Sequence, residues 1–517
     1  MERRAVRGVL WTVLSYGGAK AISLIAMLVL ARLLMPDDFG LVALATLVIG
    51  FVNLFKDLGL GATIVLRQDL DRSALGTLFT LLTALYLLTA GVVAALSPVA
   101  ALVFNEPRLT SVLALLALSL VVGAVGWFYD ALQQRELEFR LRFWAQLVLS
   151  LGTWGTSVLF ALLGFGVWAL VLGQLVGPLV FSVMQVAFAP HRVRPGFDRT
   201  VARDVLGTGR EFLFQGTLTF LQEQTASFAI GRMMNATQVG FYAMSYRLAE
   251  LPYMAVADPV AKVTFPGFAR MRLRGEPVGA AFLAALRLVA MVATPLGVLL
   301  SATAFTFTRG VLGSEWVDMS GLLLVLGLWG AIRPIQATVS WFVNSLGEVR
   351  LMGRLTLWIL FALVPATVLA AVFGGLETVG WVLVADVTIT SALFAYFAGK
   401  RSGFALTAVW RSLRPVVVAG VPCWGFAYLV SQALDGAIGA LGATAVGVLA
   451  GAVGYLGGLV LVERRILRET ATQVKAALSA GKDEDGAEPD PLTEPFGALE
   501  GMAEQAAPAE PRAGGAS

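Results

Sequence analysis

The sequence predicts an all-α integral membrane protein with about 14 transmembrane helices, built as two repeated six-helix lobes plus two extra C-terminal helices. Three observations lead to this fold class. The mean hydropathy is +0.78, only 14% of the residues are charged, and apolar runs long enough to cross a bilayer follow one another along the chain. An ordinary soluble domain carries about 25% charge. The runs lack the alternation of membrane β-strands, so helices remain as the spanning element.

Apolar stretches separated by short connections mark the predicted spans. The first stretch is too long for a signal peptide and no small-residue cleavage site follows it, so we interpret it as a retained helix. The spans are expected near residues 9–34, 39–60, 75–103, 109–133, 142–163, 166–189, 208–231, 237–264, 280–306, 319–343, 353–373, 376–397, 413–433 and 437–462.

The distribution of Lys and Arg predicts the orientation. With the N-terminus placed in the cytoplasm, one face receives about 24 basic residues and the opposite face receives four, Arg32, Arg108, Arg232 and Arg309. Such an imbalance follows the positive-inside rule. It predicts a multi-pass protein of the bacterial inner membrane with both termini in the cytoplasm.

An internal repeat divides the chain. Residues 31–43 pair with residues 231–243, each run closing one helix and opening the next on the outer face. Three weaker echoes follow in the same order: Asp57 with Asp258, residues 138–140 with 348–350, and residues 166–168 with 379–381. Because an even number of spans separates the copies, the repeats are parallel. Two lobes with a cleft between them form the architecture of alternating access.

The repeat and the composition together set the expected domains. The N-terminal six-helix lobe covers residues 1–204, the C-terminal six-helix lobe 205–404, and two additional transmembrane helices 405–468. Residues 469–517, rich in Ala, Glu, Pro and Gly at their end, are expected to form a disordered acidic cytoplasmic tail. An unstructured end is the simpler interpretation of the tail, and a regulatory role is the alternative.

Charged and polar residues inside apolar runs are the candidate substrate contacts, because a charge in hydrocarbon costs roughly 2.5–3.5 kcal/mol unless it meets water or a partner. Lys20, near the middle of the first span, is expected to face a central cavity. The alternative is an ion pair within one lobe, for example with Asp57. Glu211, Gln215 and Gln222 share one face of the seventh span, which we interpret as cavity lining.

The eighth span adds Tyr242, Tyr246 and Arg247, a combination suited to a sugar–phosphate ligand. The alternative is an internal ion pair between Arg247 and Glu250. Arg287 and Arg333 either bind an anionic headgroup from the cytoplasmic side or extend to the interface. Four residues beside helix-breaking signals are interpreted as hinge or lobe-stabilising positions rather than ligand contacts: Asp57, Gly59, Asp258 and Pro259.

Several kinds of chemistry are excluded by what the chain lacks. Cys423 is the single cysteine, so no intrachain disulfide and no thiolate metal site is expected. His191 is the single histidine and lies in a polar loop. The sequence has no phosphate-binding loop for ATP and no large outer loop for an enzyme, and its net charge of +4 does not indicate nucleic-acid binding. We therefore expect no catalytic residue, no metal and no cofactor beyond a coupling ion, H⁺ or Na⁺.

Several runs resemble a known family: residues 7–12 (RGVLWT), 30–41 (LARLLMPDDFGL), 57–60 (DLGL), 163–170 (LGFGVWAL) and 240–248 (GFYAMSYRL). Together they are similar to the polysaccharide transporter branch of the multidrug/oligosaccharidyl-lipid/polysaccharide exporter superfamily, and most like its lipopolysaccharide (O-antigen) and exopolysaccharide flippases. The resemblance covers roughly residues 5 to 410.

The resemblance implies a flippase that moves an undecaprenyl-diphosphate-linked oligosaccharide from the cytoplasmic to the periplasmic leaflet. It implies a cationic cavity, in which Lys20 and the arginines contact the diphosphate. The implied partners are the polyprenyl-diphosphate-linked glycan, membrane lipids and other polysaccharide biosynthesis proteins. The alternatives are a lipid II or cation-coupled multidrug exporter of the same superfamily, and a membrane polysaccharide polymerase or ligase.

Overall fold

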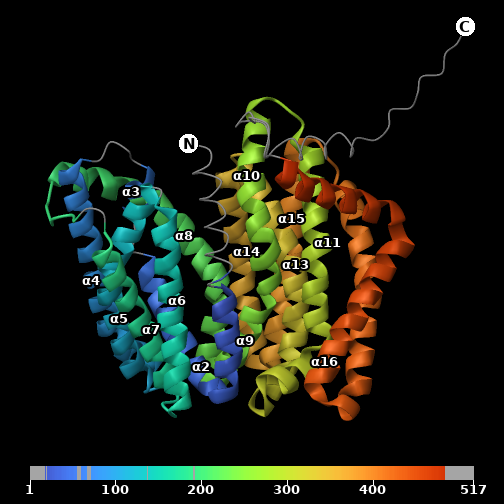
Figure 1. Ribbon diagram of the computed structural model, residues 1–517, viewed down its shortest axis with the longest axis horizontal. Coiled ribbons are helices and arrows are strands. Elements are labelled where there is room, and N and C mark those ends of the chain that lie inside the picture. Colours follow the sequence, from blue (N-terminus) through green and yellow to red (C-terminus); the bar gives the residue numbers. More distant parts are fainter. Residues whose placement is uncertain are drawn as a thin grey trace, which may run out of the picture. The chain divides into compact units, whose positions relative to one another are not determined.

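The computed structural model describes residues 18, 20–54, 60–66, 71–136, 138–189 and 192–483, and the regular structure within these ranges is helical (Figure 1). The described residues fall into two compact units. Unit 1 takes them from Met1–Met244, Leu312–Asp318 and Thr356–Val379, and unit 2 from Ser245–Val311, Met319–Leu355 and Gly380–Ser517. The expected lobes 1–204 and 205–404 remain a prediction.

Unit 1 contains the helices of the first half of the chain. A helix over residues 20–33 precedes α2. The following helices are α2 (Pro36–Asn53), α3 (Leu60–Leu66), α4 (Arg72–Val103), α5 (Leu109–Arg135), α6 (Phe139–Leu162), α7 (Val167–Ala187), α8 (Arg199–Met233) and the start of α9 (Ala236–Ala249). The core of this unit packs aromatic and aliphatic residues of α3, α4 and α5 around Phe128, which is fully buried.

Side-chain caps explain where two of these helices begin. Asp71 accepts a hydrogen bond from the Ala74 N–H (2.7 Å) at the start of α4, and Asp198 accepts one from the Thr200 N–H (2.8 Å) at the start of α8. Each bond satisfies one of the free N–H groups of a first helical turn. The cap at Asp198 explains why α8 starts at Arg199, earlier than the expected residue 208.

Small residues bring α6 and α7 together. A Cβ on Gly173 would lie 2.0 Å from the Ser157 Oγ, and a Cβ on Gly177 would lie 1.9 Å from the Thr153 Oγ1. The two glycines are four residues apart on α7, and Thr153 and Ser157 are four apart on α6. This is the small-residue packing that lets membrane helices approach closely without a hydrophobic driving force. The glycines of α7 therefore serve the packing of α7 against α6.

Unit 2 contains the end of α9 and the remaining helices. They are η1 (Tyr253–Ala257), α10 (Asp258–Leu273), α11 (Val278–Ala302), α12 (Ala304–Phe307), η2 (Thr308–Leu312), α13 (Ser320–Ser345), most of α15 (Gly375–Ser402) and α16 (Leu406–Asp483). Three further elements are not contained in unit 2. The units divide η3 (Ser314–Met319) and α14 (Val349–Leu369) between them, and η4 (Ala370–Gly374) belongs to unit 1. Helices α11, α13 and α16 share a buried core of apolar residues that ranges in size from Ala419 to Tyr455.

The long α16 folds back on itself, as Figure 1 shows. Its Gly439 has a φ of +74°, a conformation that favours glycine. On either side of this turn, Gly447 approaches Ser431 and Gly454 approaches Pro422. The two arms therefore run antiparallel, in agreement with separate expected helices at 413–433 and 437–462. Beyond them, α16 continues to Asp483.

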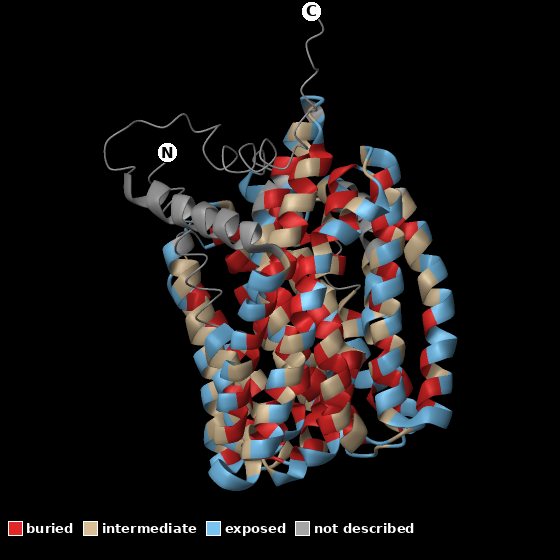
Figure 2. Cartoon of the chain, turned by 90° about the vertical axis from the view of Figure 1, so that its right-hand side faces the viewer, coloured by how far each residue is buried: buried red, intermediate tan, exposed pale blue. Residues whose placement is uncertain are grey.

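Nine helical stretches among the described residues are long and apolar enough to cross a membrane. The stretches 351–402 and 406–462, with 52 and 57 residues, are each long enough for two crossings, and they turn at Gly375 and Gly439. Large apolar side chains face outward on them, such as Trp358 and Phe361, which are 74% and 78% exposed. Figure 2 shows exposed and buried residues side by side along the same helices. The protein is therefore a multi-span membrane protein.

Three expected segments differ from the structure. The expected span 237–264 is divided into α9, the π-helical turn η1 and α10. The expected span 39–60 corresponds to α2, which ends at Asn53, and α3 begins only at Leu60. Residues 469–483, expected in the disordered tail, belong to α16. The alanine-rich run 471–480 has a high helix propensity, which outweighs its polarity. The tail from residue 484 onward lies outside the described residues.

Candidate functional site

Of the polar residues expected to line a cavity on the helix over residues 20–33 and on α8, the structure describes the side chains of two. Lys20 is exposed, and Gln222 on α8 is half-buried. Glu211 and Gln215 also lie on α8, but their side chains fall outside the described set. Although α8 has 35 residues, it is not one of the nine apolar stretches, because its polar residues lower its hydropathy.

Helix α9 carries the next group of expected contacts. Tyr242 is buried, Tyr246 is half-buried and Arg247 is exposed. Glu250, three residues further, attracts Arg247 electrostatically. The alternative of an internal interaction between Arg247 and Glu250 is therefore consistent with the structure.

Arg333 lies near the middle of α13, held between aromatic rings. Its Cζ atom is 5.4 Å from the ring centroid of Tyr253 and 5.9 Å from that of Trp329. Both distances are within the range of a cation–π interaction. The ring of Trp329 in turn packs on the ring of Tyr246, with centroids 4.9 Å apart. We name these side chains, together with Gln336, the Arg333 cluster: Arg333, Tyr246, Tyr253, Trp329 and Gln336.

Polar partners complete the surroundings of Arg333. Its Nη1 donates to the Oε1 of Gln336, and the Nε2 of Gln336 donates to the Oγ of Ser340 (3.3 Å). Asp386, half-buried on α15, attracts Arg333 electrostatically. The guanidinium is thus stabilised by rings, an amide and a carboxylate that come from three segments of unit 2.

The backbone explains how these side chains meet. A Cβ on Gly330 would lie 2.2 Å from the carbonyl oxygen of Ala249, so α9 and α13 touch at this point. Tyr246 contacts Trp329 on one side of it and Tyr253 contacts Arg333 on the other, which gives the two helices a parallel course. The π-helical turn η1 begins at Tyr253. Such turns occur frequently at functional sites.

The expected hinge residues have different outcomes. Pro259 is at the start of α10, directly after the π-helical turn, and its missing N–H removes one helical hydrogen bond. Asp258 forms an ion pair with Lys262 (2.9 Å), one turn further on. Asp57 and Gly59 lie outside the described residues. Arg287 on α11 is half-buried and shares no hydrogen bond with the Arg333 cluster among the contacts that the structure describes.

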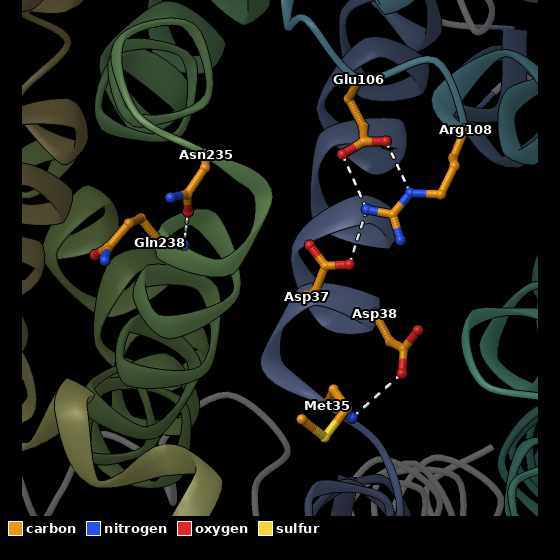
Figure 3. A network of polar contacts seen from close by, with 7 residues as sticks. All are labelled: Met35, Asp37, Asp38, Glu106, Arg108, Asn235 and Gln238. Carbon is orange, nitrogen blue, oxygen red and sulfur yellow. Dashed lines mark hydrogen bonds and ion pairs between the residues drawn. The ribbon is translucent and has the colours of Figure 1, made fainter.

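The two repeated turns, at the starts of α2 and α9, start their helices in related ways, as Figure 3 shows. In the first copy, the Met35 N–H donates to Oδ2 of Asp38 (3.2 Å). In the second copy, Oδ1 of Asn235 accepts a hydrogen bond from the Gln238 N–H (2.9 Å). These are the two halves of a capping box, one used in each copy. Both helix starts are therefore fixed by a residue pair three positions apart.

Arg108 links the first of these turns to the connection between α4 and α5. It donates to both carboxylate oxygens of Glu106 (2.8 and 2.9 Å), and its Nη2 lies 2.8 Å from Oδ2 of Asp37 (Figure 3). The bonds from Arg108 lower the pKa of the Glu106 carboxyl, and bonds to Glu106 and then to Asp37 raise the pKa of the Arg108 guanidinium. Arg108 is one of the four basic residues that the sequence places on the expected outer face. In the structure it ties the start of α2 to the connection between α4 and α5.

Sequence reasoning missed Trp329, Gln336 and Asp386. Trp329 and Gln336 are buried within an apolar helix, where a tryptophan ordinarily belongs to the core. Asp386 gave a usable signal, because a lone carboxylate in the run 381–394 is costly in lipid and requires a partner. A guanidinium in such a setting can bind a phosphate oxygen pair, since it presents two parallel N–H groups.

The chain is similar to known proteins over most of its length. A family model described as "Polysaccharide biosynthesis protein" matches residues 29–321. The chain is 26% identical over 484 residues to the succinoglycan biosynthesis transport protein ExoT of Rhizobium meliloti (strain 1021). That alignment covers 92% of this chain and 96% of the relative.

Two solved structures share the fold. The lipid II flippase MurJ in an inward closed conformation gives a TM-score of 0.69 at 12% identity, covering 89% of this chain and all of MurJ. An inward-facing multidrug resistance MATE family transporter of the MOP superfamily gives 0.56 at 16% identity, covering 77% of this chain and 95% of the transporter. The helical fold is therefore one that transporters use.

Proposed function

The chain belongs to the polysaccharide biosynthesis protein family, and from this premise we propose that it is a flippase for surface polysaccharide biosynthesis. Its substrate is an undecaprenyl-diphosphate-linked oligosaccharide, which it moves from the cytoplasmic to the periplasmic leaflet of the bacterial inner membrane. It works by alternating access of the two lobes, residues 1–204 and 205–404. The similarity to the transport protein ExoT supports this proposal.

The Arg333 cluster is the observation that carries the proposal. A cation near the middle of a membrane helix is costly unless it has a function or a partner. Here the rings of Tyr253 and Trp329 keep the guanidinium in place without neutralising it. Asp386 provides the counter-charge while the site is empty, and a diphosphate replaces it on loading. A diphosphate suits the site because its oxygens accept two N–H groups at once.

Three further basic and polar residues are proposed to contact the substrate. Each is proposed as a substrate contact by itself: Lys20 and Arg247 are exposed and supply positive charge, and Gln222 adds an amide on α8. No ATP site is expected, so a coupling ion, H⁺ or Na⁺, or the gradient of the substrate itself drives the transport. The chain acts together with the other polysaccharide biosynthesis proteins that make and use its substrate.

We also propose about 14 crossings with both termini in the cytoplasm. The nine apolar stretches supply eleven, because two of them turn at a glycine. The helix over residues 20–33, α8, and the run from α9 to α10 supply the other three. Their polar residues explain why the latter two do not count as apolar stretches.

A cation-coupled multidrug exporter is the second candidate, and Asp386 is the observation that favours it, since a drug cation requires a buried acid. A lipid II flippase differs from the first proposal only in the glycan. A change of Arg333 distinguishes the two classes of substrate, because a diphosphate needs the guanidinium whereas a cationic drug is repelled by it.

The test is export of surface polysaccharide in cells that lack the native gene and carry Arg333→Ala, Arg333→Lys or, as a control, Arg414→Ala. Arg414 is exposed on α16. We expect Arg333→Ala to reduce export about tenfold or more, since hydrogen bonds to charged groups contribute roughly 1.5–3 kcal/mol. Arg333→Lys keeps the charge but loses the paired N–H groups, so its export should be intermediate. Wild-type export by Arg333→Ala at equal protein level would remove the cluster from the mechanism.

A further inference from the structure

We infer that the repeated outer turns, at the starts of α2 and α9, form the outer gate of the transporter. Trp316 is the residue that stabilises its closed state. This inference rests on the proposed function, because a gate is required only if the protein alternates between two open faces. All the residues that carry it belong to unit 1.

The first element of the gate is a reciprocal glycine crossing. A Cβ on Gly40 would lie 1.7 Å from the carbonyl oxygen of Ala236, and a Cβ on Gly240 would lie 2.0 Å from that of Pro36. Each glycine also faces the backbone nitrogen of the other. Gly40 and Gly240, like Pro36 and Ala236, are partners in the internal repeat. The two helices therefore cross at equivalent points around a local two-fold axis.

The second element is Trp316, which is fully buried. Its Nε1–H donates to the carbonyl oxygen of Ala31 (2.7 Å), and its ring packs edge-on against Phe39, with centroids 5.3 Å apart. Phe241, from the second copy of the turn, contacts the same ring at 6.2 Å. Trp316 thus touches both copies at once and fixes the closed crossing through a single directional bond.

A matching aromatic comes from the first half. Phe104 packs on Phe228 of α8 with centroids 5.7 Å apart, and a Cβ on Gly231 would lie 3.1 Å from its ring. Gly231 is the repeat partner of Ala31. Each half therefore places one aromatic side chain from its outer connection against the end of the first helix of the other half. This reciprocity is what a symmetric closing surface requires.

The composition of this surface suits repeated opening. Glycine backbone and flat rings meet closely but bury no charge, so their separation exposes little that needs a new partner. Asp37, a charged residue of the first turn, is paired within the first half, where Arg108 binds both it and Glu106 (Figure 3). Glycine contacts bury little apolar area and contribute little hydrophobic free energy. The closed state consequently depends on Trp316. Because so few contacts stabilise it, the gate can open and close repeatedly.

The test measures access to a residue behind the crossing. In a Cys423→Ala background, Tyr246→Cys on α9 provides a single thiol deeper along the helix than Gly240. A membrane-impermeant maleimide applied to the outer side of cells labels it only when the gate is open. Trp316→Phe, which keeps a ring but removes the N–H, and Gly240→Ala are compared with Gly91→Ala, whose Cβ would meet nothing within 4 Å.

We expect Trp316→Phe to increase the labelling rate about two- to tenfold, the ratio that corresponds to one lost buried hydrogen bond. Gly240→Ala should increase it further, and Gly91→Ala should leave it unchanged. If the Gly240→Ala protein does not accumulate in cells, the labelling rate of the Trp316→Phe variant alone tests the inference. A Trp316→Phe variant that is less heat-stable but labelled at the control rate would show that the crossing does not open, and this would overturn the inference.

The labelling needs no substrate, so its outcome is separate from that of the proposed function. Changed labelling together with export that is indifferent to Arg333 would retain the gate and reject the diphosphate site. Unchanged labelling together with Arg333-dependent export would retain the flippase and reject this gate.

Discussion

Glu106 and Arg108 illustrate how one residue pair can fix a helix end at the membrane surface. Arg108 holds both oxygens of Glu106 and reaches Asp37 at the start of α2. Because the bonds lower the pKa of the Glu106 carboxyl, its ionised form stabilises the folded protein. The stabilisation is present above the ordinary pKa of a glutamate, about 4.3, and is lost as the pH falls through the lowered value.

Replacement of Glu106 by Gln tests this linkage. We expect the variant to be less stable than the wild type at neutral pH by about 0.2–1 kcal/mol, the range of a partly exposed ion pair. The difference should shrink as the pH falls through the lowered pKa of the wild-type Glu106 carboxyl, because that group then also becomes neutral. Thermal denaturation in detergent across this pH range measures it, with Glu315→Gln, at an exposed position, as the control. A difference that grows in acid would contradict the assignment.

At the residue scale the sequence identified part of the Arg333 cluster. Arg333 and Tyr246 were predicted because a charge and a hydroxyl are conspicuous in apolar runs. Trp329 was missed because tryptophan is common in buried helix faces, and only the contact with Arg333 gives it a role. Whether Lys20 and Gln222 touch substrate stays a prediction, since exposure alone does not identify a ligand.

At the scale of elements, backbone approach dominates the packing of α6 and α7. Gly173 and Gly177 bring α7 against Thr153 and Ser157 of α6, so that any added side chain would meet backbone or hydroxyl atoms. In lipid, where apolar residues gain little from pairing with one another, such close approach supplies much of the association free energy.

The substitution Gly177→Ala is expected to destabilise the protein by about 1–3 kcal/mol, since the new Cβ would overlap Thr153. The control is Gly155→Ala on α6, where the Cβ would meet nothing within 4 Å. Adding Thr153→Ala to Gly177→Ala should restore part of the loss, because it removes the hydroxyl that lies nearest. Thermal unfolding in detergent compares the three, and equal stability of both glycine variants would contradict this packing.

Sequence alone predicts the limits of several helices to within a few residues, because the apolar run and the helix end at nearly the same residue. The expected 109–133 corresponds to α5 at Leu109–Arg135, and the expected 166–189 to α7 at Val167–Ala187. The start of α8 was missed because its first turns are polar, and hydropathy cannot separate a polar helix from a loop. The π-helical turn at Tyr253–Ala257 leaves no hydropathy signal, although Pro259 marks its neighbourhood.

At the scale of the whole molecule, the internal repeat is the feature that links sequence to function. The offset of 200 residues predicted which turns correspond, and the structure brings two of them, at Gly40 and Gly240, into reciprocal contact. Correspondence in sequence does not predict contact, so the crossing could be found only in three dimensions. The division into lobes at residues 204 and 404 remains a prediction, and so does the orientation that the arginines indicate.

Transport of a lipid-linked oligosaccharide by the purified protein in vesicles tests the central claim most directly. The measured quantity is the rate at which undecaprenyl-diphosphate-linked oligosaccharide, loaded in one leaflet, becomes accessible to a glycan-cleaving enzyme on the other side. We predict that wild-type protein accelerates this rate over protein-free vesicles and that Arg333→Ala removes most of the acceleration while Arg414→Ala keeps it. Equal rates with wild-type protein, with Arg333→Ala and with empty vesicles would contradict the account.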